Sequence, residues 1–287
     1  DMAERTVFVG DGDSFSTGKH NLKFFTAPMV HWPEVMFTYD ETDKVLFSAD
    51  AFGTFGALDG RIFNDELDYR NNFMDEARRY YTNIVGKYGP FVQSLLKKAT
   101  PILPDIKYIC PLHGPVWRND FEYLLDKYNK WSSYEPEEKA VMIAYASMYG
   151  NTEFAAQILA TKLVERGIKN VVVYDVSNTH VSQLISEAFR VSHIALCSVT
   201  YNLGIYPVMH NFLNDMKALN LQNRTVAIVE NGSWTPRSGD LMEQFLDEEM
   251  KFMDVLNERV TVSSSVNDSR EKELDSLAET IVSSLNE

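Results

Sequence analysis

Residues 141–163 read VMIAYASMYGNTEFAAQILATKL and join three patterns in one short stretch. An apolar run of strand length comes first, a polar segment around Gly150 follows, and Ala, Ile and Leu then recur at helical spacing. A buried strand, a tight turn and a long helix form the opening unit of a parallel α/β domain. The polar turn is therefore expected at the carboxyl end of a strand, where such domains bind their ligands.

The same alternation continues to the end of the chain. Apolar strand-like runs are expected at residues 139–147, 170–177, 193–200, 225–232 and 259–266. Amphipathic helices are expected at residues 152–167, 180–189, 208–220, 240–253 and 270–285. Five strands that alternate with helices predict a doubly wound parallel sheet, which we assign to residues 136–287.

The upstream part, residues 1–135, has a different pattern and ends in a polar, Pro-containing stretch that is typical of a linker. Short strands are expected at residues 5–11, 21–28, 34–40 and 44–50. A helical block follows at residues 65–99, and the segment IKYICPLHGP comes after it. Strands first and helices later predict part of a layered α/β sandwich.

Composition excludes several classes of function. The chain has 287 residues, of which 45% are hydrophobic, so two domains with sizeable cores are expected. Its net charge of −14 argues against nucleic acid or an anionic membrane as the main partner. Cys110 and Cys197 form no CxxC pair and no disulfide framework, which favours a reducing, cytoplasmic location. We expect no membrane-spanning segment, because no apolar run reaches about 18 residues.

The polar turn, residues 147–152, has the chemistry of a phosphate cradle. Ser147, Asn151 and Thr152 offer hydroxyl and amide donors, and Gly150 lets the backbone curl close to a ligand. The first N–H groups of the following helix are unpaired and carry partial positive charge. The alternative is an ordinary capped loop, since Asn and Thr are common N-cap residues.

Two further loops favour the ligand hypothesis. SVTYNLG (residues 198–204) and ENGSWTP (residues 230–236) leave the third and fourth strands at the same edge of the sheet. A planar ring could lie between Tyr201 and Trp234, with backbone groups of Asn202 and Gly232 bonded to its polar edge. A phosphate at one loop and a flat ring between two others predict flavin mononucleotide (FMN). The expected cofactor-binding residues are Ser147, Met148, Tyr149, Gly150, Asn151, Thr152, Ser198, Val199, Thr200, Tyr201, Asn202, Gly204, Asn231, Gly232, Ser233 and Trp234.

The segment SMYGNT (residues 147–152) resembles the phosphate loop of the flavodoxin family, which has the form (S/T)-x-(S/T/Y)-G-x-T. The strand–helix order after about residue 140 is also similar to the five-stranded fold of that family. The resemblance implies an FMN domain that moves electrons one at a time.

Three upstream residues are candidate metal ligands: His31, Asp50 and His113. Asp50 follows a strand, and both histidines lie beside Pro at loop entries, where side chains can converge. A carboxylate between two cations can bridge them, and neutral imidazoles can complete each coordination shell. The alternative is that these are surface or packed residues, as we expect for the other four histidines.

The strings HWPEVMF, LFSADAFG and PLHGP resemble the later ligand strings of the metallo-β-lactamase fold, in the version fused to a flavodoxin domain. That fusion is the flavodiiron protein family. The resemblance implies an α/β fold: a partial metallo-β-lactamase-like αββα sandwich followed by a flavodoxin-like five-stranded doubly wound parallel sheet. It implies two iron ions beside FMN, with one iron on His31, one on His113 and Asp50 between them.

The resemblance further implies reduction of dioxygen to water, of nitric oxide to nitrous oxide, or of both. Tyr80 or Tyr81 would donate a hydrogen bond to the bound gas. A head-to-tail homodimer, or a dimer of such dimers, would bring the flavin of one chain close to the irons of the other. Rubredoxin or a similar small protein would supply the electrons.

One departure from the family pattern leaves alternatives open. The H-x-E-x-D-H string that provides the first metal ligands of the family does not occur in this sequence. We expect these ligands in a segment that precedes Asp1 or in a separate chain. The alternatives are an FMN-binding electron carrier with an incomplete, inactive metal domain, and a metal hydrolase with an appended flavodoxin domain.

Overall fold

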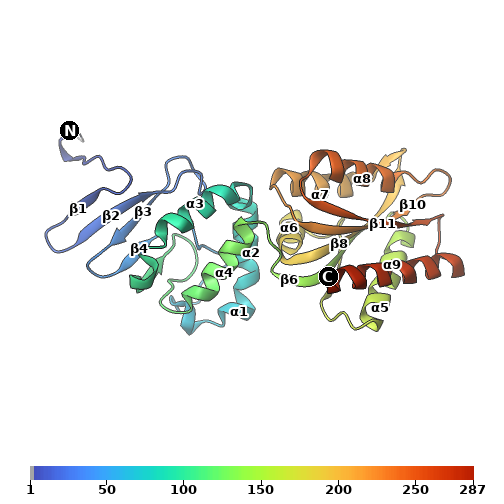
Figure 1. Cartoon of the computed structure of the whole chain (residues 1–287), viewed down its shortest axis with the longest axis horizontal. Coiled ribbons are helices and arrows are strands. Elements are labelled where there is room, and N and C mark those ends of the chain that lie inside the picture. The colour runs from blue at the N-terminus through green and yellow to red at the C-terminus, as the bar shows by residue number, and fades with distance from the viewer. Residues whose placement is uncertain (1–2) are drawn as a thin grey trace. The chain divides into compact units, whose positions relative to one another are not determined.

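The computed structural model describes residues 3–287 and divides the chain into two compact units (Figure 1). The first unit extends to Ser133, and the second unit comprises Tyr134–Glu287. The division lies two residues before the boundary expected from the sequence. Each unit has its own hydrophobic core.

The second unit is built on a parallel sheet with the strand order β11-β10-β8-β6-β7. Counted along this unit alone, the order is 2-1-3-4-5, which is the flavodoxin-like arrangement. The expected five-stranded doubly wound sheet is therefore confirmed. A two-residue strand, β9 (Gly204–Ile205), pairs antiparallel with the end of β8. The five main strands are β6 (Glu138–Ala146), β7 (Val171–Asp175), β8 (Val191–Tyr201), β10 (Arg224–Asn231) and β11 (Met253–Val262).

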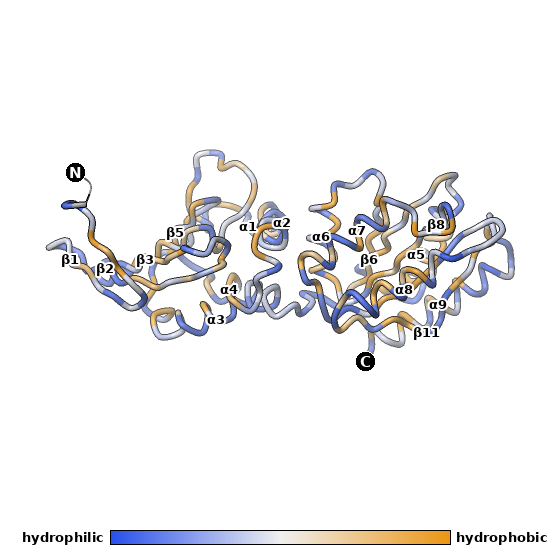
Figure 2. Tube along the Cα trace, turned by 90° about the horizontal axis from the view of Figure 1, so that it is seen from above, coloured by the Kyte–Doolittle hydropathy of each residue, from blue (hydrophilic) through white to orange (hydrophobic). Residues whose placement is uncertain are grey.

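Helices cover both faces of this sheet. One core contains apolar residues of α6 (Val181–Arg190), α7 (Pro207–Ala218) and α8 (Ser238–Glu249). The other core contains residues of α5 (Asn151–Glu165) and α9 (Asp268–Asn286). The inner strands β6, β8 and β10 contribute apolar residues to both cores, as strands covered on both faces must, and hydrophobic stretches of this unit can be followed in Figure 2.

The structure corrects the expected bounds of one helix and one strand. The helix expected at residues 240–253 ends at Glu249, and β11 begins at Met253, six residues before the expected strand. Met253 and Val255 pack in the core on one face of the sheet, whereas Leu256 packs in the core on the other. The segment therefore follows strand alternation, although its apolar residues also fit helical spacing.

A buried arginine anchors the start of the second unit. Arg224, the first residue of β10, is 1% exposed and donates to the backbone carbonyls of Ala188 and Phe189 at the end of α6. It also donates to the carbonyl of Tyr134, the first residue of the unit, at 2.8 Å. Burial lowers the pKa of Arg224 to about 9. The carbonyl partners offset the cost of removing the guanidinium from water.

The first unit contains one sheet with the order β1-β2-β3-β4-β5, antiparallel except for the β4–β5 pair. Figure 1 shows β1 to β4 in this order, with α2, α3 and α4 beside them. The strands are β1 (Ser14–Ser16), β2 (Asn21–Thr26), β3 (Met36–Asp40), β4 (Val45–Phe47) and β5 (Tyr108–Cys110). The α-helices are α1 (Tyr69–Asn72), α2 (Met74–Ile84), α3 (Gly89–Ala99) and α4 (Phe121–Ser132).

The two faces of this sheet differ. Tyr39, Leu46 and Ile109 lie in one cross-strand row and are buried against the helices. The next residues along the strands point the other way, and among them Phe47 is 49% exposed and Tyr108 is 37% exposed. Within the described residues, the unit is thus one sheet with one helical layer. This arrangement confirms the prediction of a partial sandwich.

Two upstream expectations were wrong in detail. The strand expected at residues 5–11 does not form; a short 3₁₀ turn, Ala3–Arg5, leads into irregular chain in which the Phe8 side chain is exposed. The expected helical block at residues 65–99 is divided into α1, α2 and α3. Gly86 lies in a short 3₁₀ turn between α2 and α3, and Pro90 lies in the first turn of α3, where its missing N–H costs nothing.

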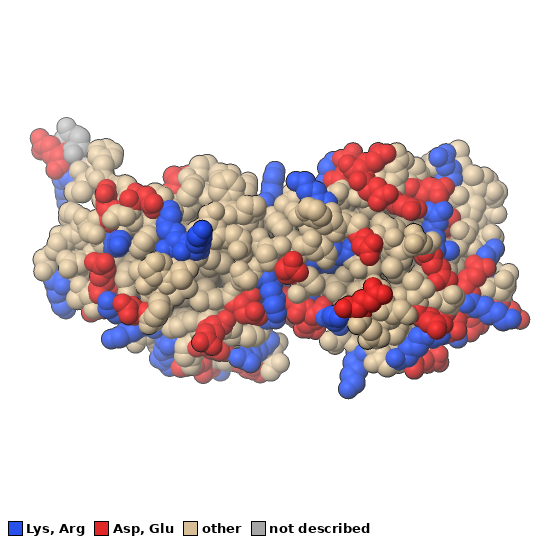
Figure 3. All heavy atoms as spheres, viewed as in Figure 1, with Lys and Arg blue, Asp and Glu red and all other residues tan. Residues whose placement is uncertain are grey.

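Charged side chains are spread over the surface. On the face of the second unit seen in Figure 3, acidic side chains gather over α8, which contributes Asp240, Glu243, Asp247, Glu248 and Glu249. Of the helices formed by residues 3–287, none combines the length and apolar character that crossing a bilayer requires.

The buried His193 predicts a pH dependence of stability. Its Nδ1 lies 2.8 Å from Ser192 Oγ and its Nε2 lies 3.1 Å from Ser284 Oγ. Burial lowers its pKa to about 4, an effect that Lys139 strengthens and Asp254 opposes. Because the unfolded chain binds the proton more readily, the stabilising contribution is complete above the unfolded pKa of about 6.5 and is lost as the pH falls toward 4.

We therefore expect the free energy of unfolding to fall between pH 7 and pH 5, and His193→Gln to reduce that fall. Denaturant titrations at both pH values measure the difference. His210→Gln, at an exposed histidine of the same unit, is the matched control. An equal pH dependence in all three proteins would contradict the prediction.

Candidate functional site

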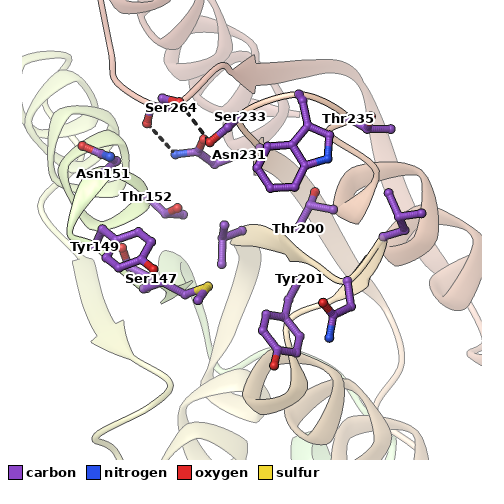
Figure 4. A pocket seen from close by; sticks show the side chains of 16 residues that line it. Ser147, Tyr149, Asn151, Thr152, Thr200, Tyr201, Asn231, Ser233, Thr235 and Ser264 are labelled. Atoms are coloured by element: carbon purple, nitrogen blue, oxygen red, sulfur yellow. Dashed lines mark hydrogen bonds between the residues drawn. The ribbon is translucent and has the colours of Figure 1, made fainter.

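A cavity of about 650 Å³ opens at the carboxyl ends of the parallel strands in the second unit. Its walls come from the β6–α5 turn, the β8–β9 hairpin, the loop after β10 and Ser264 after β11. Figure 4 shows Tyr149 and Thr152 on one side, Tyr201 on another, and Asn231, Ser233 and Ser264 together. Its volume lies within the range of small-molecule and cofactor sites.

The β6–α5 turn presents an uncapped helix N-terminus to this cavity. Gly150 precedes the helix with a φ of 84°, and its N–H donates to Ser147 Oγ at 3.1 Å. Gly150 is the N-cap residue and has no side chain with which to cap the first turn of α5, while Asn151 and Thr152 line the cavity beside it. Free amide donors at a helix start attract an anion, so this turn fits a phosphate group.

The opposite walls are held by hydrogen bonds between loops. Asn231 Nδ2 donates to the Ser264 carbonyl at 3.0 Å, and Ser264 Oγ donates to Ser233 Oγ at 3.1 Å (Figure 4). Thr200 Oγ1 accepts from the Ser238 N–H at 3.1 Å, which ties the β8 end to the start of α8. The cavity is therefore preformed by its own loops.

The rim of the cavity is aromatic and uncharged. Tyr149 and Trp234 are almost fully exposed, at 87% and 86%, and Tyr201 is 39% exposed. The sixteen lining residues include no Asp, Glu, Lys or Arg. Such a lining suits a planar aromatic ligand whose phosphate is bound by backbone amides.

The structure brings together most residues predicted to bind the cofactor. The predicted residues that line the cavity are Ser147, Met148, Tyr149, Asn151, Thr152, Val199, Thr200, Tyr201, Asn202, Asn231, Gly232, Ser233 and Trp234. Gly150 shapes the turn but is not in the wall. Ser198 is fully buried below it, and Gly204 lines a separate cavity with Ile205 and His210.

Three lining residues were missed from the sequence: Leu203, Thr235 and Ser264. Leu203 and Asn202 both have positive φ values, of 60° and 49°, and form the turn between β8 and β9. Ser264 follows the fifth strand. The rule that ligands gather at carboxyl ends of strands applies to it as well, and the polar run at residues 263–265 was the available signal.

In the first unit, His31, Asp50 and His113 converge although they are far apart in the sequence. His31 Nε2 lies 3.6 Å from Asp50 Oδ2, and His113 Nε2 lies 3.3 Å from Asp50 Oδ1. Each carboxylate oxygen thus faces a different imidazole. The three donors fit a pair of transition-metal ions with a carboxylate between them, since imidazole and carboxylate are ligands that iron accepts.

Two glycines allow the loops of this group to approach each other. A Cβ on Gly53 would lie 3.2 Å from the Tyr80 ring. A Cβ on Gly114, whose φ is 86°, would lie only 2.3 Å from Thr54 Cγ2. Gly114 follows His113 directly, so close packing against Thr54 helps to set the position of that histidine.

The structure separates the two candidate tyrosines. Tyr80 Oη donates to Asp50 Oδ1 at 3.4 Å, and the Tyr80 ring lies 5.7 Å from the His113 ring. Burial and the Asp50 carboxylate raise the pKa of Tyr80 well above its usual value, so its hydroxyl keeps its proton. Tyr81 is fully buried and packs against Tyr128 and Trp131. Only Tyr80 therefore lies beside the candidate ligands.

A second group of potential ligands consists of His20, Asp40 and Asp43. His20 Nδ1 lies 2.7 Å from Asp40 Oδ2, while Asp40 Oδ1 accepts from the Thr42 N–H at 2.9 Å and more weakly from the Asp43 N–H. The Asp40 carboxylate is thus used in stabilising the β3–β4 turn, which we interpret as its role.

Comparison with known proteins agrees with this two-part architecture. Residues 3–114 match the family described as ODP family beta lactamase, and residues 143–275 match the flavodoxin family. A nitric oxide reductase of Moorella thermoacetica is 34% identical over 84% of this chain and 59% of its own. An anaerobic nitric oxide reductase flavorubredoxin of Aeromonas hydrophila is 31% identical over 83% of this chain and 47% of its own. The chain spans about half the length of the curated relatives it matches.

Among solved structures, the rubredoxin oxygen:oxidoreductase of Desulfovibrio gigas is similar with a TM-score of 0.89 and 28% identity. The similarity covers 97% of this chain and 68% of that one. The flavodiiron protein of Giardia intestinalis shares the fold, with a TM-score of 0.85 at 24% identity.

Fold and sites together define a two-domain flavoprotein with a β-lactamase-like metal domain. The chain belongs to the flavodiiron protein family.

Gly114→Ala should lower the free energy of unfolding of the first unit by about 2 kcal/mol more than Gly12→Ala does, because the new methyl group overlaps Thr54. Gly12→Ala is the control, since Gly12 has a similar φ of 82° and no atom within 4 Å of the added Cβ. Thermal unfolding of the variants measures the difference. Equal losses would mean that backbone strain alone explains the effect.

Proposed function

We propose that the chain is the FMN- and iron-binding part of an oxidoreductase that reduces dioxygen to water, nitric oxide to nitrous oxide, or both. The observation that carries the proposal is Asp50, whose two oxygens face the imidazoles of His31 and His113 at 3.6 and 3.3 Å. A preformed cavity of about 650 Å³ in the same chain would provide the site for FMN.

At the metal centre, His31 and His113 would each hold one iron and Asp50 would lie between the two ions. Bound iron would supply the redox chemistry of gas reduction. Tyr80 would contribute a protonated hydroxyl beside Asp50, positioned as a hydrogen-bond donor. The remaining ligands would come from another polypeptide segment, whether of the same protein or of a separate chain.

The exposed face of the first unit's sheet supports such a segment. Phe15, Phe47 and Tyr108 lie on that face, where each is at least one-third exposed. Apolar sheet faces are normally covered in a folded protein. A segment that covered this face would also approach Asp50, which follows β4.

At the flavin site, residues 147–152 would hold the phosphate of FMN, and Tyr201 and Trp234 would flank its ring. Backbone groups of Asn202 and Gly232 would bond its polar edge. Bound FMN would supply one-electron transfer. The exposed, uncharged rim suits contact with another protein surface.

We further propose a head-to-tail homodimer, or a dimer of such dimers, with residues 198–204 and 230–236 in the interface. Sedimentation across a dilution series tests it, and a fully active monomer would refute it. For the electron donor we propose rubredoxin or a similar small protein, a class that the name of the Desulfovibrio gigas relative includes. Cys110 and Cys197 are free thiols, which suits the cytoplasmic location that we also propose.

The deciding experiment measures iron per flavin in the purified protein, together with consumption of dioxygen and nitric oxide. About two iron ions per FMN with gas consumption would support the reductase. Flavin with almost no iron would favour the alternative, an FMN-binding electron carrier with an incomplete, inactive metal domain.

Asp50→Ala should remove iron and leave FMN bound, because the two sites lie in different units. The matched control is Asp43→Ala, at an exposed carboxylate of the His20 group. Metal analysis and the visible flavin spectrum measure the two cofactors separately. Loss of both cofactors together, or equal iron loss in the control, would count against the assignment.

Asn151→Leu and Thr152→Leu should each raise the Kd of FMN about tenfold or more, since bulky apolar groups would block the phosphate cradle. Glu153→Leu is the control, because Glu153 is the next residue of α5 and does not line the cavity. Fluorescence titration of the apoprotein with FMN gives the affinities. Unchanged binding in both cradle variants would refute the phosphate assignment.

A further inference from the structure

A buried carboxylate lies directly behind the wall of the flavin cavity. Glu230, near the end of β10, is 4% exposed. Its Oε2 accepts the Gly239 N–H at 2.9 Å, and its Oε1 accepts Thr261 Oγ1–H at 2.8 Å. Carboxylates are rarely buried unless each oxygen is paired, and both oxygens are paired here.

These two hydrogen bonds join three elements around one loop. Asn231, which follows Glu230, is the last residue of β10, and the loop of residues 232–237 leads from it to α8, which begins at Ser238. Residues 231–235 line the flavin cavity. Through its two hydrogen bonds, Glu230 holds the end of β10 to Gly239 in the first turn of α8 and to Thr261 in β11.

The same helix start holds the neighbouring wall. Ser238 Oγ donates to the Ser198 carbonyl at 2.9 Å, and the Ser238 N–H donates to Thr200 Oγ1 at 3.1 Å. Thr200 lines the cavity. A shift of the α8 N-terminus would consequently move both the loop after β10 and the end of β8.

Steric contacts show that the arrangement is tight. A Cβ on Gly239 would lie 2.8 Å from Arg259 Cδ and 3.0 Å from the Glu230 carboxylate carbon. Within the loop, a Cβ on Gly232 would lie 2.9 Å from Pro236 Cα. Glycine therefore occupies a position beside the Glu230 carboxylate and a position where the loop folds closely against itself.

A nearby arginine does not account for the burial of Glu230. Arg259 Nε lies 3.8 Å from Glu230 Oε1, whereas its other nitrogens contact Asp240 Oδ1 at 2.6 Å and Glu243 Oε2 at 3.4 Å. Asp240 and Glu243 are exposed carboxylates on α8. The amide and hydroxyl donors therefore hold Glu230 more directly than the ion pair does.

We propose that Glu230 is a positioning residue for the flavin: its carboxylate fixes the loop that carries Gly232 and Trp234 in the geometry that receives the ring. The inference rests on the proposed FMN site. A loop fixed before binding loses less conformational entropy when the ligand enters, so the carboxylate favours affinity without touching the cofactor.

Three variants of the whole chain test this role. Glu230→Ala removes both hydrogen bonds, and we expect the Kd of FMN to rise about tenfold or more. Glu230→Gln can accept the Gly239 N–H and donate to Thr261, so it should stay within about threefold of the wild type. Glu243→Ala, which removes an exposed carboxylate from the same arginine, is the matched control and should bind FMN as the wild type does.

The readout that separates positioning from general stability is the fluorescence of bound FMN, which stacked aromatic rings quench. We expect Glu230→Ala to bind FMN with weaker quenching at saturation, and Glu230→Gln and Glu243→Ala to restore wild-type quenching. Circular dichroism of each apoprotein confirms that it is folded. If Glu230→Ala does not fold, Thr261→Val, which removes one of the two donors, should still weaken FMN several-fold.

The inference would be overturned if folded Glu230→Ala bound FMN with wild-type affinity and quenching. If Glu230→Ala does not fold, the same result in Thr261→Val would overturn it. Either result would leave the proposed FMN site intact. Equal losses in Glu230→Ala and Glu243→Ala would also overturn it, because the shared arginine would then be responsible. A wild-type chain that binds no FMN would instead refute the proposed function itself.

Discussion

The cofactor cavity depends on one constraint, the parallel pairing of β6, β8 and β10. Ala146 pairs with Ser198, and Ser198 pairs with Glu230, so β6 and β10 end beside neighbouring residues of β8, which itself continues to Tyr201. Parallel strands point all their carboxyl ends to one edge, and each following loop must leave there. The uncapped α5 N-terminus, the β8–β9 hairpin and the loop after β10 surround one space because the register leaves no other place for them.

The metal candidates depend on a different constraint, which is the close approach of loops that no local pattern brings together. Asp50 follows β4, whereas His31 precedes β3 and His113 follows β5. Adjacent strands of one sheet deliver these loops to neighbouring positions, and Gly53 and Gly114 remove the side chains that would keep them apart. The Asp50 carboxylate then lies between two imidazoles, and its ion pairs among the described residues are both with histidine.

The sequence predicted the parts of the fold that local patterns control, and it failed where long-range packing decides. Five apolar runs sufficed for the parallel sheet, and the SMYGNT turn sufficed to locate one wall of the cavity. The start of β11 was missed because Met253, Val255 and Leu256 fit both helical and strand spacing until two cores select the strand. Tyr80 and Tyr81 are neighbours on α2, and only tertiary structure shows that one faces Asp50 while the other enters the aromatic core. No local pattern in the sequence indicates that Glu230 turns inward toward α8, because a glutamate in the same local sequence could equally be exposed to solvent.

Arg224 has a consequence for where the second unit can be separated from the rest of the chain. Its guanidinium is bonded to the carbonyl of Tyr134 as well as to the end of α6. The first residue of the unit is therefore a component of its buried polar network. An autonomous flavin module cut from this protein needs Tyr134 at or inside its new terminus, because a cut a few residues later would leave a fully buried cation with one acceptor fewer. In a gene fusion, or in the recombination of domains during evolution, a boundary that keeps this hydrogen bond must therefore include Tyr134.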